Sequence, residues 1–132
     1  MLGLDTNILV RYVVRDDARH LAQVDRLFER RLSKITPGFV NSVVLAEFVW
    51  VLERTYRFAR PEIAAAVADL IGSEQIELEH DACIEEALEI FTSTPVGFTD
   101  ILISLINRTR GCATTLTMDR GQRHLKTATV LL

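Results

Sequence analysis

The sequence predicts a single α/β domain, built on a short, mainly parallel sheet that helices cover on both faces. Short apolar runs typical of strands alternate with longer runs whose apolar residues recur at helical spacing. This alternation is typical of parallel sheets with crossover helices. The chain has 132 residues and no repeat, linker or low-complexity segment, so residues 1–132 are predicted to form one domain around one core.

The chain opens with a predicted buried strand over residues 2–4. A helix is then expected from Thr6 to Val14, because its apolar residues fall at helical spacing. Asp16 and Asp17 break that helix and can cap the next one, which is predicted over residues 18–32.

Turn and capping residues divide the middle of the chain. Pro37-Gly38 ends the first helical segment, Ser42 is a candidate N-cap, Pro61 suits a first helical turn and Gly72 suits a C-cap. The elements predicted between these signals are a strand over 39–41, a long and largely buried helix over 43–58, and a helix over 63–71.

The second half repeats the alternation. Asp81 and Thr99 are candidate N-caps, and Gly111 is expected to stop the helix that Thr99 begins. The predicted elements are a strand over 76–79, a helix over 82–91, a turn over 94–97, a helix to about 110, and strands over 114–117 and 130–132.

Composition excludes some functions. The net charge of −3 argues against a sequence-general nucleic-acid binder with a large basic face. Only Lys34 and Lys126 of the 15 basic residues are lysines, which leaves 13 arginines. Arginine forks match phosphate oxygens, although a GC-rich genome also explains this bias.

The chain is predicted to be cytoplasmic. No apolar run approaches the roughly 18–20 residues that span a bilayer, and the N-terminus lacks the basic start of a signal peptide. Cys83 and Cys112 have no metal-type spacing, and a reducing compartment disfavours a disulfide between them.

Four carboxylates stand near predicted strand ends or helix starts: Asp5, Glu47, Asp100 and Asp119. Glu47 interrupts an apolar run and Asp100 precedes one, and a buried ionised acid needs a partner. Because ligands of parallel sheets bind beyond the carboxyl ends of the strands, the four acids are expected to meet there. They would repel one another without a cation, and oxygen ligands suit Mg²⁺ or Mn²⁺. Such a site commonly orients phosphates and activates water.

Each acid also fits a purely structural role. Asp5 can serve as an N-cap, Asp100 as a partner of a helix dipole, Glu47 as half of an ion pair, and Asp119 as a turn residue near Gly121. Other titratable residues are expected on the solvated surface: Glu74, Glu77, Glu79, Glu85, Glu86, Glu89, His20, His80 and His124.

At these residues the chain resembles PIN-domain proteins, in particular the VapC toxins of bacterial VapBC toxin–antitoxin modules. Leu4-Asp5-Thr6-Asn7-Ile8-Leu9 resembles the first family motif, with its metal-binding acid at Asp5, and Ser42-Val43-Val44-Leu45-Ala46-Glu47 resembles the second. Asp100-Ile101-Leu102-Ile103 resembles the third motif and Thr117-Met118-Asp119 the fourth.

The resemblance implies a three-layer α/β/α sandwich and a ribonuclease that depends on Mg²⁺ or Mn²⁺. It also implies a homodimer that a small antitoxin neutralises, with the antitoxin's tail in a groove near the active site. Close relatives often carry an Asp where this chain has Gly97 and an aromatic residue where it has Gln122. The first difference could remove an accessory acid, and the second is expected to alter packing after Asp119.

The resulting hypothesis is hydrolysis of an RNA phosphodiester. Asp5 and Asp100 would hold the main metal ion, Asp119 would complete its site, and Glu47 would bind metal or position the attacking water. The residues expected to support the acids or the phosphate are Thr6, Asn7 and Thr117, and those expected to contact the RNA backbone are Arg11, Arg120 and Arg123.

Two alternatives stay open. One is a phosphotransfer enzyme of the haloacid dehalogenase type that uses Asp5 as nucleophile, but that fold usually has a second Asp where this chain has Asn7. The other is a binding module that keeps the fold and lacks catalysis.

Overall fold

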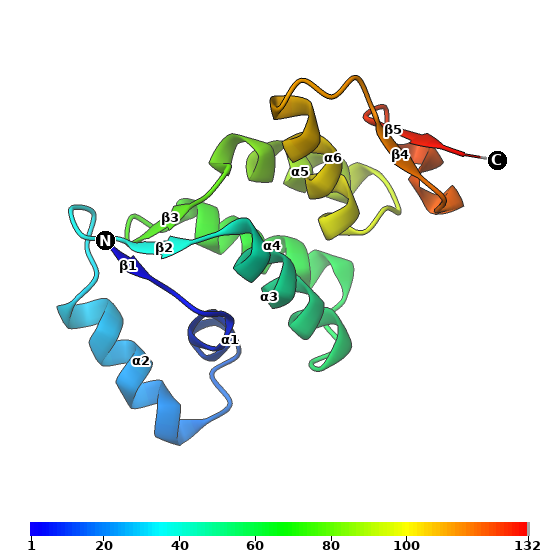
Figure 1. Ribbon diagram of the computed structural model, residues 1–132. Coiled ribbons are helices and arrows are strands. Elements are labelled where there is room, and N and C mark those ends of the chain that lie inside the picture. The colour runs from blue at the N-terminus through cyan, green and yellow to red at the C-terminus, as the bar shows by residue number, and fades with distance from the viewer. Residues whose placement is uncertain (132) are drawn as a thin grey trace. The chain divides into compact units, whose positions relative to one another are not determined.

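The computed structural model describes residues 1–131 as two compact units, Met1–Glu79 and a second unit that begins at His80 (Figure 1). Each unit is described by itself. The elements of the first unit are β1 (Leu2–Gly3), α1 (Thr6–Val14), α2 (Ala18–Arg30), β2 (Gly38–Val40), α3 (Ser42–Arg54), α4 (Arg60–Gly72) and β3 (Ile76–Leu78).

The first unit contains a three-stranded parallel sheet in the order β1-β2-β3. Parallel neighbours need crossover connections, which α1 and α2 supply between β1 and β2, and α3 and α4 between β2 and β3. In the register, Gly38 lies opposite both Leu2 and Ile76. A Cβ at Gly38 would come within 2.5 Å of the Leu4 side chain, so glycine is required for this close packing.

Helix starts in this unit follow the expected chemistry with one exception. Asp5 caps α1 and Asp17 caps α2 through their side chains, as predicted. Ser42 is not the N-cap of α3: the side chain of Asn41 accepts a hydrogen bond from the Val44 amide at 2.8 Å, and Ser42 is the first helical residue.

The prediction of a long, buried helix over 43–58 is wrong in two respects. The helix ends at Arg54, and the chain turns away through Arg57, which has a φ of 56°. Only one face is buried, that of Leu45, Phe48, Val49 and Leu52. Val43 is 77% exposed and Trp50 is 56% exposed, so a largely apolar sequence forms a one-sided helix.

The next helix begins at Arg60, three residues before the predicted range of 63–71, and ends at Gly72, one residue after it. Pro61 lies in the first turn of α4, and the Glu62 side chain accepts a hydrogen bond from the Ala59 amide at 2.9 Å. Gly72 is the last helical residue, and Ser73 is the C-cap.

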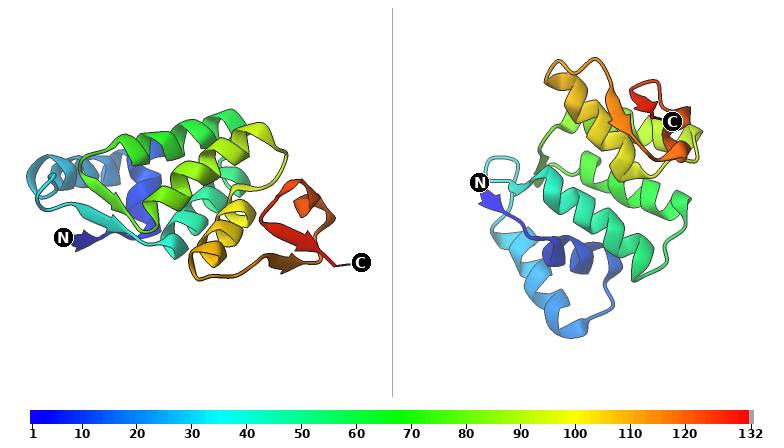
Figure 2. Two further views of the ribbon diagram at one scale, coloured as in Figure 1. Left: turned by 90° about the horizontal axis from the view of Figure 1, so that it is seen from above. Right: turned by 45° about the vertical axis from the view of Figure 1, so that its right-hand side comes forward.

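The second unit contains α5 (Asp81–Ser93), α6 (Phe98–Thr109), β4 (Thr115–Thr117), the 3₁₀ helix η1 (Arg120–His124) and β5 (Ala128–Val130). The strands β4 and β5 pair in parallel, and α5 packs against α6 (Figure 2). Gly111, with a φ of 90°, follows the end of α6 as expected.

Three boundaries differ from the prediction in this unit. Asp81 is the first residue of α5 and not its cap, and Gly97 is the N-cap of α6 in place of Thr99. The last strand begins at Ala128, two residues earlier than expected, and the predicted position Leu132 lies outside the described residues.

The α/β class with short parallel sheets is therefore confirmed, and its strands lie in two sheets. That residues 1–132 form one domain stays a prediction. No helix within residues 1–131 has the length and apolar character needed to cross a membrane.

Candidate active site

Asp5 lies at the junction of β1 and α1. Its backbone is extended, with a φ of −85°, and its Oδ1 accepts a hydrogen bond from the Thr6 amide at 2.7 Å. The Asp5 side chain is exposed, whereas Thr6 is buried. Asp5 is therefore the N-cap of α1. Its carboxylate still lies at the solvent surface, where Oδ2 is available to a ligand.

Glu47 lies on the exposed face of α3, one turn from Val43 and one turn from Trp50. No hydrogen bond or ion pair joins its side chain to another of the described residues 1–131. The expectation that Glu47 is buried, and therefore needs a partner, is wrong because α3 turns this residue toward solvent. Its candidacy rests on its motif and on its unpaired, accessible carboxylate.

Asp100 and Asp119 lie close enough in the second unit to affect each other electrostatically. Asp100 is half-buried in the first turn of α6. Partial burial, and secondly the negative charge of Asp119, raise the pKa of the Asp100 carboxyl. Like charges that act on each other favour a nearby proton or cation, and an oxygen-only donor set fits a hard divalent ion.

The Asp119 carboxylate is held by a tight turn at the start of η1. Its Oδ1 accepts a hydrogen bond from the Gly121 amide at 2.8 Å, and its own amide donates to Thr117 Oγ1 at 3.0 Å. A Cβ at position 121 would come 3.1 Å from Asp119 Oδ1. Gly121 is therefore a site residue that the sequence signalled only by its spacing from Asp119. Thr117 therefore contacts Asp119 through the backbone amide of Asp119 and not through its carboxylate.

The two departures from the family pattern both lie next to this pair. A Cβ at Gly97 would stand 3.6 Å from Asp100 Oδ2, so an Asp there would add its charge directly beside Asp100. Gln122 is buried, and its backbone amide donates a hydrogen bond to the Asp119 carbonyl at 3.1 Å. Gln122 therefore occupies a packing position behind Asp119.

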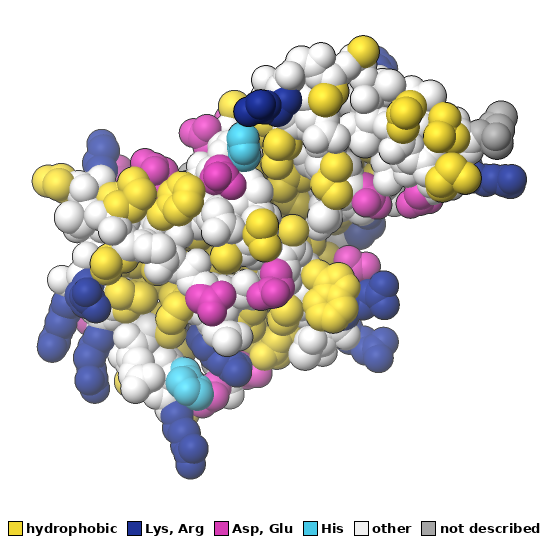
Figure 3. All heavy atoms as spheres, in the orientation of Figure 1, with side chains coloured by type: hydrophobic (Ala, Val, Ile, Leu, Met, Phe, Trp, Pro, Cys, Tyr) yellow, Lys and Arg dark blue, Asp and Glu magenta, His cyan; other side chains and the backbone are white. Residues whose placement is uncertain are grey.

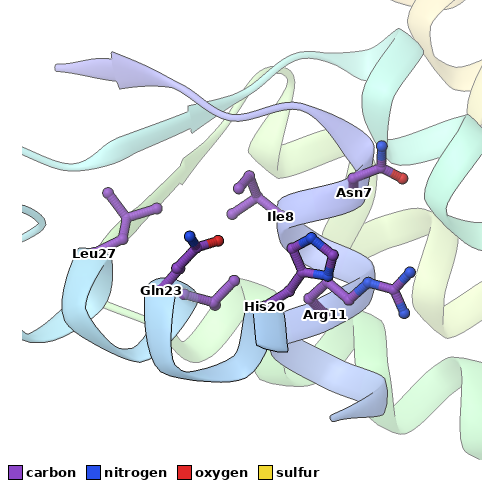
Figure 4. A pocket seen from close by; sticks show the side chains of 7 residues that line it. Asn7, Ile8, Arg11, His20, Gln23 and Leu27 are labelled. Atoms are coloured by element: carbon purple, nitrogen blue, oxygen red, sulfur yellow. The ribbon is translucent and has the colours of Figure 1, made fainter. Parts of the chain in front are cut away.

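A pocket of about 220 Å³ lies between α1 and α2 (Figure 4). Asn7, Ile8 and Arg11 line it from α1, and His20 and Gln23 line it from α2. Asn7 is exposed, two residues beyond Asp5. The pocket thus lies beside the helix start that carries Asp5.

The three arginines expected to contact RNA differ in how they are engaged. Arg11 is bonded to Asp16 at 3.0 Å and to the Tyr56 hydroxyl at 3.4 Å, so a phosphate would compete with Asp16 for it. Arg123 donates to the Arg120 carbonyl at 3.0 Å, and the Arg120 side chain is exposed.

Two glutamates expected on the solvated surface are partly buried and engaged. Glu79 accepts a hydrogen bond from the Ser42 amide at 2.9 Å, at the start of α3, and Glu86 pairs with Arg108. Alternation with Ile76 and Leu78 correctly placed Glu77 outside, but Glu79 follows the end of the strand, where alternation no longer applies.

The structure brings together Asp100 and Asp119, with Gly97, Thr117 and Gly121 beside them. Asp5 and Glu47 belong to the first unit and Asp100 and Asp119 to the second. Among residues 1–131, no three side chains of Asp, Glu, His or Cys lie together within either unit as a metal-binding group. The meeting of all four acids therefore stays a prediction.

The fold and these motifs define an α/β protein of a known family. Residues 3–128 match the family described as PIN domain, and the chain belongs to it. It is 25% identical over 127 residues to the VapC ribonuclease of Aquifex aeolicus (strain VF5), an alignment that covers 96% of this chain and 93% of that protein. It is also similar to the crystal structure of VapC20 from Mycobacterium tuberculosis, a sarcin–ricin loop cleaving toxin. That similarity has a TM-score of 0.44 and 19% identity, over 94% of this chain and 92% of the other.

Proposed function

We propose that this protein is a divalent-metal-dependent endoribonuclease and the toxin of a toxin–antitoxin module. Membership of the PIN domain family and the similarity to a VapC ribonuclease over nearly the whole chain support this function. The single observation in the site that carries it is the Asp100–Asp119 pair, whose mutual repulsion a divalent cation would relieve.

In this proposal Asp5, Asp100 and Asp119 hold Mg²⁺ or Mn²⁺. The bound ion would lower the pKa of a coordinated water and neutralise charge on the scissile phosphate. Glu47, which is exposed and unpaired among the described residues, positions the attacking water or adds a further oxygen to the ion.

The remaining residues hold the carboxylates and the substrate. Thr6 fixes Asp5 through its amide, and Thr117 fixes the Asp119 turn. Asn7, Arg11, Arg120 and Arg123 are assigned to the RNA backbone. In the hydrolysis, the water oxygen forms a bond to phosphorus, one bridging P–O bond breaks, and the proton that the water loses balances the one that the leaving oxygen gains.

We also propose the partners that such toxins have. These are an RNA substrate, a second copy of the chain in a homodimer, and a small cognate antitoxin, all in the cytoplasm. Coexpression of the chain with its candidate antitoxin, followed by copurification and measurement of the oligomer mass, tests the two protein partners.

The catalytic proposal is tested by cleavage of total cellular RNA with Mg²⁺, with Mn²⁺ and with EDTA. Asp5→Asn and Asp100→Asn are each expected to lower the rate on the order of 100-fold or more, because several kcal/mol of transition-state stabilisation depend on the ion. Glu85→Gln, which removes an exposed acid on α5, is the matched control and should cleave like the unaltered protein. Undiminished metal-dependent cleavage by both Asn variants would reject the assignment.

A further inference from the structure

The outward face of α2 carries a row of long polar side chains. Arg19, Gln23, Arg26 and Arg30 are all exposed and follow one another at intervals of four, three and four residues. At 100° per residue these positions lie on one narrow stripe along the helix. Val24 and Phe28, the buried residues of α2, lie on the opposite side.

Within residues 1–131, the three arginines of this stripe form no ion pair with an acid. Among residues 1–131, the guanidinium groups of Arg19, Arg26 and Arg30 make no ion pair and no hydrogen bond. Other arginines of the chain do find acids: Arg11 pairs with Asp16, Arg15 with Asp25 and Arg108 with Glu86. In Figure 3, Lys and Arg side chains project into solvent on the side where α2 lies.

The electrostatics of the helix do not explain the stripe. Arg26 and Arg30 are four residues apart, a spacing at which like charges destabilise a helix by a few tenths of a kcal/mol. Arg19 lies in the first turn, where the helix dipole disfavours a cation, and only Arg30 gains from its place in the last turn. Arg19 therefore stands at a position that the isolated helix does not favour, whereas Glu29, three residues after Arg26, offsets the repulsion between Arg26 and Arg30.

We propose that this α2 stripe binds the sugar–phosphate backbone of single-stranded RNA, as a docking surface separate from the carboxylates. The inference rests on the proposed ribonuclease function. Arg19 and Arg30 are separated by about 16 Å along the helix axis, so the stripe is a row and not a compact cluster. A row of guanidinium forks matches a chain of regularly repeated phosphates. Arg31 and Lys34, both exposed, continue the positive charge beyond the helix end.

The stripe also adjoins the side of the unit that carries Asp5. Gln23 belongs to the stripe and at the same time lines the pocket between α1 and α2. Asn7 lines the same pocket from the first turn of α1, two residues after Asp5 (Figure 4). An RNA strand that is bound on α2 can therefore extend across this pocket to the start of α1, entirely within the first unit.

The test compares two triple variants of equal charge change. One is Arg19→Gln/Arg26→Gln/Arg30→Gln. The control is Arg54→Gln/Arg57→Gln/Arg110→Gln, which removes three other exposed arginines without an ion pair among the described residues. Binding of a fluorescent single-stranded RNA of mixed sequence is measured in EDTA, where no cleavage occurs, over a range of salt concentrations. Thermal melting checks that both variants fold.

The α2 variant is expected to bind at least about 10-fold more weakly, and its log–log salt slope should fall by about 2, because three phosphate contacts contribute about 0.7 each. The control should stay within about twofold of the unaltered protein. Equal loss in both variants, or no RNA binding by the unaltered protein, overturns the proposal. Stripe-dependent binding of polyglutamate without binding of RNA also overturns it, in favour of an acidic protein partner.

The cleavage assay separates this inference from the proposed function. RNA binding through α2 without any cleavage keeps the docking surface and rejects the ribonuclease. Cleavage with an unchanged kcat/KM in the α2 variant keeps the ribonuclease and rejects the docking surface.

Discussion

At the scale of single residues, the Asp100 carboxyl has the most informative environment. Its pKa is raised above the ordinary value of about 3.9, first by partial burial and then by the charge of Asp119. The folded state therefore holds this proton more tightly than the unfolded chain does. Stability falls as the pH rises through the interval between the ordinary and the raised pKa, because there the folded state binds more protons.

Replacing Asp100 by Asn removes this cost. In EDTA near neutral pH, Asp100→Asn is expected to melt at a higher temperature than the unaltered protein. The difference should shrink as the pH falls below the ordinary pKa of about 3.9, because the carboxyl is then protonated in both the folded and the unfolded state. Added Mg²⁺ should stabilise the unaltered protein and have little effect on the variant. Melting curves across pH check this, and a lower melting temperature of the variant near neutral pH without metal would contradict it.

Gly97 offers a second residue-scale test. Gly97→Asp would place a carboxylate beside Asp100, because a Cβ there stands 3.6 Å from Asp100 Oδ2. The backbone has a φ of −64°, which any residue adopts, and Gly97 is the N-cap of α6. Gly97→Asn supplies the same cap without the charge, and it serves as the control.

The Asp variant is expected to bind Mg²⁺ several-fold more tightly than the Asn variant and to melt at a lower temperature without metal. Isothermal titration and melting in EDTA measure the two effects. Equal Mg²⁺ affinity of the two variants would show that position 97 does not contribute to the ion site.

At the scale of elements, one side chain links a helix end to a strand. Gln75, just before β3, donates from Nε2 to the carbonyls of Phe28 and Leu32, at the end of α2. Such end carbonyls have no partner within their own helix. Gln75 therefore ties the C-terminal end of α2 to the sheet.

Gln75→Glu turns this donor into an acceptor that faces two carbonyl oxygens. We expect it to lower the free energy of unfolding by about 1–3 kcal/mol, and Gln75→Ala to lower it by about 1 kcal/mol. Gln23→Glu, the same change on the exposed stripe of α2, is the control and should stay within about 0.5 kcal/mol. Urea denaturation measures all three, and equal effects of the two Glu variants would remove the structural role assigned to Gln75.

The same scale shows what sequence reasoning can predict. Helix-capping and helix-breaking residues act on the backbone next to them. Helix boundaries are therefore found at Asp5, Asp17 and Gly111, as the sequence indicates. The extent of burial could not be read from α3, because Val43 and Trp50 are apolar yet exposed. Burial depends on which face the rest of the fold covers, and periodicity cannot show this in a helix that is apolar nearly all round.

At the scale of the whole molecule, the candidate site rests more on the order of the motifs along the chain than on the local chemistry of each acid. Glu47 and Asp100 stand in apolar stretches of sequence, yet Glu47 is exposed and Asp100 is only half-buried. Their order in four motifs agrees with the PIN domain match over residues 3–128. The sequence does not single out Gly121 as a site residue, because its role lies in having no Cβ, which would come 3.1 Å from Asp119 Oδ1 in the folded turn.

The prediction that acids of both units share one ion can be tested by a double-mutant cycle. Asp5→Asn, Asp100→Asn and the double variant are compared by the rise in melting temperature that saturating Mg²⁺ produces. If one ion bridges both carboxylates, each single change should remove most of that rise and the double change little more, because groups that act as a unit are not additive. Glu85→Gln with Asp100→Asn is the control pair, and its effects should add. Additive losses for Asp5 and Asp100 would place them at separate sites, and the four-carboxylate centre would then have to be abandoned whatever the ribonuclease assay shows.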